Sequence, residues 1–255
     1  MKIEKLKRLP SGKYKIIFDN DENLITYDDV ILKNNLLFNK EVDNELLEDI
    51  NLDTEYYNIY NKVLNYIIKR KRSIKEIKEY LKKFNLSEVD NNFIIETFKD
   101  NGLLNDENFA KSYIADKVYL SNLGPNKIKD ELINHDIDIN IIEEEINNIS
   151  KEVIKEKLKK IISKKIKSNQ NKSNYMLKQK ILYELINNGY DKEMIIELID
   201  NLLTNDLDIA KKEYEKIYNK LSKKYSGNEL ENKTRQKMYQ KGFDYSTFCS
   251  LKKEE

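Results

Sequence analysis

The chain has 255 residues, of which 39% are hydrophobic and 36% are charged, and its formal net charge is +1. No apolar run approaches the roughly 18 residues that a membrane-spanning helix needs, and the N-terminus lacks the apolar core of a signal peptide. We therefore expect a soluble cytoplasmic protein with no membrane partner. The single cysteine, Cys249, permits no intrachain disulfide and no thiolate metal cluster.

The N-terminal segment, residues 1–53, differs in kind from the rest of the chain. Residues 13–18 and 24–27 are short β-prone runs, and the polar stretch between them predicts a hairpin. Residues 28–37 fit a short helix, and residues 39–53 fit either an acidic connector or a helix. We interpret this segment as a cap for the open end of a repeat array, in preference to an independent functional domain.

One motif recurs four times after this cap. Each copy opens on an apolar residue, here called the anchor, and successive anchors are 51, 53 and 53 residues apart. The anchors are Leu81, Leu132, Leu185 and Met238. Four positions later stands a residue type that tolerates the left-handed conformation ending a helix: Asn85, Asp136, Gly189 or Gly242. A second apolar residue and then a helix-capping residue follow, so each copy predicts a helix, a tight corner and another helix.

An amphipathic stretch precedes each copy, which predicts units of three helices. The predicted repeats, numbered 1 to 4, are residues 54–104, 105–149, 150–203 and 204–255. Ser173 and Ser226 lie further upstream of their anchors than Ser73 and Gly124 do, so the middle helix should be longer in repeats 3 and 4. The predicted fold is mostly α: tandem three-helix repeats stacked into an elongated curved array, with a small N-terminal cap containing a β-hairpin.

Charge alternates in sign along these segments. Counting Lys and Arg against Asp and Glu, residues 1–55 carry −5, 56–105 carry +4, 106–149 carry −6, 150–203 carry +5 and 204–255 carry +3. A protein that only grips nucleic acid should be basic throughout, and the sequence pI here is about 7.6. Mixed polarity is typical of a surface that meets a mixed partner, such as a protein already coated on nucleic acid.

Basic residues recur just before the anchor of every repeat, and a basic cluster marks the first corner. For any single lysine, a solvated helix face is the simpler interpretation. Recurrence favours a repeated basic stripe on one face of the array. We predict a partner-binding or DNA-binding surface made of Lys69, Arg70, Lys71, Arg72, Lys75, Lys78, Lys127, Lys129, Lys178, Lys180, Lys233 and Arg235.

No pattern indicates catalysis, a metal site or a cofactor. The one histidine, His135, falls at a helix corner where the other repeats place unrelated residues, which favours a variable corner position over a general base. The chain has no phosphate-binding glycine loop of either common type. Cys249 lies near the end of the last short helix and fits a packed thiol better than a nucleophile.

Three short patterns are shared with a known family. An R-S-x-x-E-[IL] start lies at residues 72–77, a G-[LY]-[LI]-[ND]-D-x-x-[FY]-[AC] joint at 102–110, and a G-x-x-x-I-x-x-E-L helix at 124–132. Over about residues 56–149, and more weakly to Leu203, the chain resembles the RecX family of bacterial recombination regulators. The hairpin resembles an extension of many members from Firmicutes. Two departures are Asn85 and Asp136 in place of the corner glycine, and a fourth repeat, from Ala210, where the family is described with three.

The resemblance implies a non-enzymatic regulator that binds RecA filaments on single-stranded DNA, and we expect this chain to be a monomer. It would restrain RecA ATPase activity, strand exchange and the downstream DNA-damage response, with possible direct contact to DNA. Two alternatives share the predicted fold: a helical-repeat protein that acts directly on nucleic acid, and a protein-interaction scaffold. Salt separates the alternatives, because direct DNA binding weakens steeply as salt rises.

Overall fold

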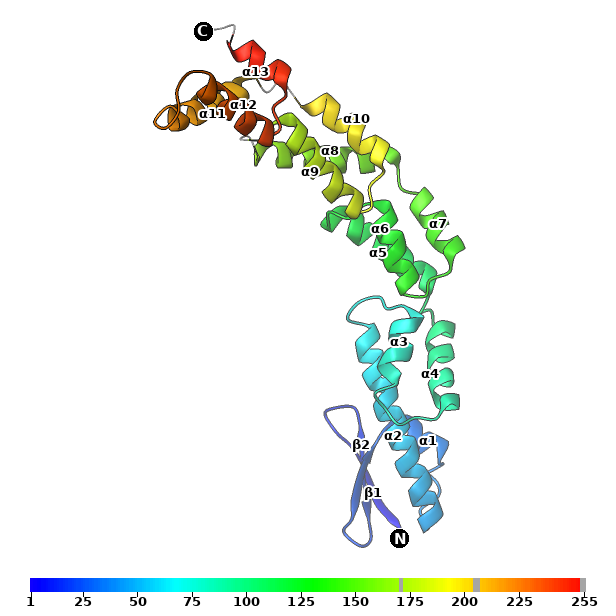
Figure 1. Cartoon of the computed structure of the whole chain (residues 1–255). Coiled ribbons are helices and arrows are strands. Elements are labelled where there is room, and N and C mark those ends of the chain that lie inside the picture. The colour runs from blue at the N-terminus through cyan, green and yellow to red at the C-terminus, as the bar shows by residue number, and fades with distance from the viewer. Residues whose placement is uncertain (170–171, 204–206, 253–255) are drawn as a thin grey trace. The chain divides into compact units, whose positions relative to one another are not determined.

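A computed structural model describes residues 1–169, 172–203 and 207–252. In these ranges the chain forms three strands and thirteen helices (Figure 1) and divides into two compact units, Met1–Phe109 and Ala110–Glu255. The predicted mostly α fold of three-helix repeats behind a small β-containing cap is confirmed. The exact repeat boundaries given above stay predictions.

The first unit begins with an antiparallel sheet of order β1-β2-β3, formed by β1 (Ile3–Arg8), β2 (Tyr14–Phe18) and β3 (Asn23–Thr26). The hairpin is therefore present, and β1 adds a strand that was not predicted. Only Ile3 and Leu6 in β1 are apolar among its charged residues, so its sequence carries little β signal. Main-chain pairing with β2 supplies the strand structure instead.

The helices of the first unit are α1 (Asp28–Lys33), α2 (Asn44–Ile67), α3 (Ile74–Leu81) and α4 (Glu88–Asp100). Helix α2 serves two cores, because Ile50 packs with the sheet and α1 while Val63 packs with α3 and α4. The hydroxyls of Thr26 on β3 and Thr54 on α2 share a buried hydrogen bond of 2.6 Å. The cap is thus built on the same continuous helix that opens repeat 1, and residues 44–53 are helix and not connector.

The remaining helices are α5 (Asp106–Leu120), α6 (Pro125–Asn134), α7 (Ile139–Asn147), α8 (Lys151–Lys167), α9 (Asn174–Asn187), α10 (Lys192–Leu202), α11 (Leu207–Leu221), α12 (Gly227–Gln240) and α13 (Tyr245–Lys252). The middle helices α9 and α12 have 14 residues each, against 8 in α3 and 10 in α6, which confirms the predicted lengthening. All four anchors are buried. The predicted caps also form, with Ser87, Asp138, Asp191 and Asp244 each accepting a hydrogen bond from a backbone N–H of the following helix.

Three of the four corners are left-handed, as predicted. The φ angles are +57° at Asp136, +84° at Gly189 and +85° at Gly242. The prediction is wrong for repeat 1, where Asn85 is not among the described residues with positive φ. Helix α3 ends at its anchor, Leu81, two residues earlier relative to the anchor than the other middle helices, so a longer turn replaces the left-handed corner.

Candidate protein and nucleic-acid interface

Two arginines of the predicted cluster at residues 69–72 hold the corner between α2 and α3. The guanidinium of Arg72 lies 3.7 Å from the ring centroid of Tyr66, and its Nε donates to the Tyr66 carbonyl oxygen at 3.3 Å. Its side chain is only 11% exposed. Arg70 donates to both carboxylate oxygens of Glu76, at 2.6 and 3.2 Å. Glu76 also completes the capping box of α3 with Ser73, so these arginines stabilise the helix start.

The two lysines of the cluster remain on the surface. Lys69 is exposed, and Lys71 is exposed with a 3.4 Å contact from its Nζ to the Asn108 carbonyl oxygen. The two residue types in this cluster therefore differ in role. The arginines stack and form bidentate contacts, whereas the lysines can reach a partner.

The basic pairs on the middle helices point in different directions. In repeats 2, 3 and 4 the two members of each pair stand two positions apart and are separated by about 200° around the helix, so one stripe cannot contain both. Lys129 on α6 forms a 2.7 Å ion pair with Glu143 on α7, and Lys178 on α9 forms a 2.5 Å ion pair with Asp200 on α10. These two lysines tie the middle helix to the third helix of their own repeat.

The other members of these pairs form a regular set. Lys127, Lys180 and Lys233 stand five residues before the anchors of repeats 2, 3 and 4, and all three are exposed. We call them the recurring lysines. Lys78 and Arg235 are also exposed, three residues before their anchors, whereas Lys75 is half-buried. Sequence alone could not separate these groups, because the acidic partners lie on another helix.

The recurring lysine of repeat 2 lies at a close joint between repeats. The corner of repeat 3 packs on the N-terminus of α6, where Gly124 N–H donates to the Asn188 carbonyl at 2.7 Å and Asn126 N–H donates to the Gly189 carbonyl at 3.1 Å. A Cβ on Gly189 would lie 2.2 Å from the backbone nitrogen of Lys127. The joint therefore fixes the backbone from which Lys127 projects.

The next joint repeats this arrangement. The corner of repeat 4 packs on the start of α9, where Ser173 Oγ donates to the Lys241 carbonyl at 2.8 Å. A Cβ on Gly242 would lie 2.6 Å from Met176 Cγ. Lys127 and Met176 each stand three residues after the N-cap of their helix, so the corner meets the same helical position in both joints.

Lysine and glutamate side chains connect the helices of repeat 2 to one another and to α8. Lys157 on α8 donates to the carbonyls of Lys117 and Leu123 at 3.1 and 2.9 Å, and burial lowers the pKa of its ammonium group. Burial alone would raise the pKa of Glu131, but hydrogen bonds from Lys117 and Tyr113 outweigh it and lower that pKa. Glu131, the glutamate of the motif at residues 124–132, thus links α5 to α6.

The single histidine has a structural position. His135 is the C-cap residue of α6 and its ring lies beside the Tyr113 ring.

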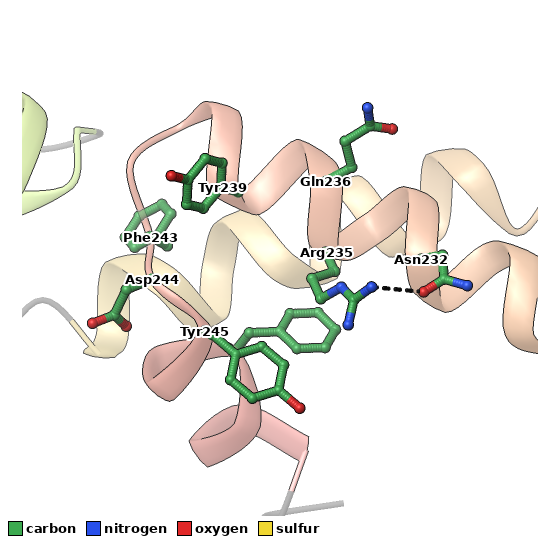
Figure 2. Close-up of a pocket in the computed structure, with 8 residues that line it drawn as sticks. Asn232, Arg235, Gln236, Tyr239, Phe243, Asp244 and Tyr245 are labelled. Atoms are coloured by element: carbon green, nitrogen blue, oxygen red, sulfur yellow. Dashed lines mark hydrogen bonds between the residues drawn. The ribbon is translucent and has the colours of Figure 1, made fainter.

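A pocket of about 470 Å³ opens at the corner between α12 and α13. Figure 2 shows Arg235 beside Tyr245, with its guanidinium hydrogen-bonded to Asn232, while Tyr239 lies on the last turn of α12 at the other end. The residues Tyr239 and Tyr245 are 75% and 65% exposed, and the buried residues Phe243 and Phe248 close the floor. The sequence analysis named Arg235 as a candidate but missed Tyr239 and Tyr245. The i, i+4 spacing of Arg235 and Tyr239, which puts them on one face of a helix, could have indicated Tyr239.

The described residues supply neither metal-binding nor membrane-spanning elements. No group of three or more His, Cys, Asp or Glu side chains in these ranges could hold a metal ion. None of the described helices is long and apolar enough to cross a membrane. Cys249 is a free, half-buried thiol.

The chain is similar to proteins of the RecX family. Residues 105–145 match the model of the second three-helix domain of RecX, and residues 204–248 match that of the third. Proteins called Regulatory protein RecX are 32% identical in Streptococcus uberis, over 99% of this chain and 98% of theirs, and 30% identical in Listeria welshimeri, over 93% and 90%. The match at 204–248 extends the family likeness through repeat 4.

Solved structures share the fold. A crystal structure of regulatory protein RecX aligns with a TM-score of 0.65 at 22% identity, covering 78% of this chain and 98% of that one. The crystal structure of RecX from Lactobacillus salivarius aligns with a TM-score of 0.54 at 28% identity, covering 58% and 96%.

Proposed function

This chain belongs to the RecX family of regulatory proteins, and from that premise we propose that it binds RecA filaments on single-stranded DNA. It acts there as a non-enzymatic regulator that restrains ATP hydrolysis, strand exchange and the DNA-damage response that follows. Family membership over nearly the whole chain is the observation that carries this proposal.

The recurring lysines are the proposed contact points with the filament. Lys127, Lys180 and Lys233 are exposed at the same position of three successive repeats, so a partner that also repeats can meet them together. Exposed charges contribute little to folding but add across an interface. Lys69, Lys71, Lys78 and Arg235 extend the exposed set, whereas Arg70, Arg72, Lys129 and Lys178 are already engaged within the fold.

The direct test measures DNA-dependent ATP hydrolysis by the RecA of the same host. We expect the purified protein to lower hydrolysis at about equimolar ratio to RecA, under conditions where micromolar affinity saturates binding. Unchanged hydrolysis together with no binding to preformed filaments would overturn the proposed function.

The contact points are tested by removing three charges at a time. Changing Lys127, Lys180 and Lys233 together to Gln should weaken filament binding by about ten-fold, because three rim charges that each contribute about 0.5 kcal/mol sum to about 1.5 kcal/mol. The matched control changes Lys129, Lys155 and Lys178 to Gln, which removes the same charge from lysines paired with acidic side chains. Equal loss in the two triple variants would show that net charge, and not the recurring position, governs binding.

A further inference from the structure

We propose that the pocket between α12 and α13 binds one unstacked nucleobase of single-stranded DNA. The inference deepens the proposed function, since it names a direct contact to the DNA of the filament. The pocket lies entirely in the second unit and is lined by α12, α13 and the corner between them.

The lining suits a flat heteroaromatic ring with polar edges. Tyr239 and Tyr245 are exposed aromatic residues, and base stacking on such rings tolerates any sequence. Arg235 lies 6.0 Å from the ring centroid of Tyr245, which adds a planar cation to the same wall. The volume of about 470 Å³ lies within the range of small-molecule sites.

A pair of polar groups stands at the rim of the pocket. The Arg235 guanidinium donates to the Asn232 side-chain oxygen at 3.0 Å, so an amide and a guanidinium lie together where the polar edge of a base could meet them. Asp244 is the one acidic side chain in the lining, and its carboxylate is engaged by Ser246 Oγ at 2.9 Å and the Thr247 N–H at 2.8 Å. An aliphatic peptide side chain would leave the guanidinium and the Asn232 amide unused.

Further basic side chains stand on α12, outside the lining of the pocket. Lys233 and Lys237 stand on the same helix, and both are exposed. Together with Arg235 and Tyr239 they interleave charge and aromatic rings along α12, a pattern typical of single-strand binding.

Repeat 4 has this combination and its neighbour does not. The positions of repeat 3 that correspond to Arg235, Tyr239 and Tyr245 hold Leu182, Ile186 and Lys192. The aromatic and basic lining is therefore a property of this corner, and not of the three-helix repeat in general. Tyr183 on α9, 73% exposed, supplies a matched control for a tyrosine outside the pocket.

The test compares two fluorescent oligonucleotides of equal length, oligothymidylate and a fully abasic strand with the same phosphates, each titrated with the full-length protein alone. The wild type should bind oligothymidylate about ten-fold more tightly, the size of one base–aromatic stack. The double variant Tyr239→Ala, Tyr245→Ala should bind both strands equally, with an unchanged salt slope because the phosphate contacts remain. Tyr183→Ala should keep the wild-type preference.

Other results overturn the proposal. A wild type without base preference, or a double variant that retains it, would show that no base enters this pocket. A double variant that keeps base preference but no longer inhibits RecA would assign the pocket to a protein segment. Failure of the proposed function would look different: base preference would be intact while RecA hydrolysis was unaffected.

Discussion

The hydroxyl of Tyr190 is a buried polar group in the hydrophobic core of repeat 3. Tyr190 is the second apolar residue of the repeat motif, is 3% exposed, and packs with Leu185 and Ile195. Its hydroxyl makes no hydrogen bond with the described residues. Burial raises the pKa of Tyr190 to about 12. A phenylalanine would keep the packing and remove the unpaired group.

Changing Tyr190→Phe should therefore raise the free energy of unfolding at neutral pH by about 1 kcal/mol. Wild-type stability should also fall between about pH 10 and pH 12, because the unfolded tyrosine, with an ordinary pKa near 10, releases its proton before the folded one does. Burial raises the pKa of Tyr56 to about 12 as well, so the variant should lose only part of this slope. Urea unfolding at neutral and alkaline pH measures both effects, and an identical alkaline slope would contradict the assignment to Tyr190.

At the scale of elements, the joints between repeats depend on glycine for two separable reasons. Gly102 has φ +68°, and a Cβ there would meet no atom within 4 Å, so this position needs only conformational freedom. Gly124 has an ordinary φ of −93°, but a Cβ there would lie 2.6 Å from the Gly189 backbone. Gly189 has both features, because its φ is +84° and a Cβ there would lie 2.2 Å from the Lys127 backbone nitrogen.

These glycines predict a graded series of alanine variants. Gly102→Ala should cost about 1 kcal/mol from left-handed strain alone. Gly124→Ala should cost more, about 1–3 kcal/mol, because backbone must shift to relieve the overlap. Gly189→Ala should cost most, since strain and overlap combine. Urea unfolding measures the series, with Asn85→Ala as a control at a corner without positive φ; a Gly124→Ala variant no less stable than Gly102→Ala would show that the joint is looser than described.

The sequence predicted what local patterns determine and missed what distant elements bring together. Anchor spacing and capping residues gave the helices, because both act within one helix and its corner. Strand β1 was missed because its partner supplies its hydrogen bonds, and the corner at Asn85 was wrong because α3 ends early. The predicted basic surface proved to contain both exposed and ion-paired residues for the same reason, because the carboxylates that pair with Lys129 and Lys178 stand on a later helix.

At the scale of the whole molecule, stability should be transmitted from neighbour to neighbour. In the second unit each described joint places a corner on the middle helix of the preceding repeat, through Gly189 in one case and Gly242 in the other. The first unit has its own two cores, which share α2. The stability of a repeat protein built this way is approximately the sum of the stabilities of its units and of the contacts between neighbouring units.

Gly242→Val therefore should damage the end of the chain and spare the first unit. The new side chain would overlap Ser173 Oγ at 2.5 Å while φ is +85°, so the contact of repeat 4 with α9 must open. Native-state hydrogen exchange should show lost protection in α12, α13 and the first turn of α9, a smaller loss in the rest of repeat 3, and none in α2, α3 and α4. Gly12→Val, at φ +84° in the turn before β2, is the reciprocal control and should perturb the N-terminal sheet alone. Uniform loss of protection along the chain in the Gly242→Val variant would mean that the protein unfolds as one cooperative body, and local joints would then carry no separate share of its stability.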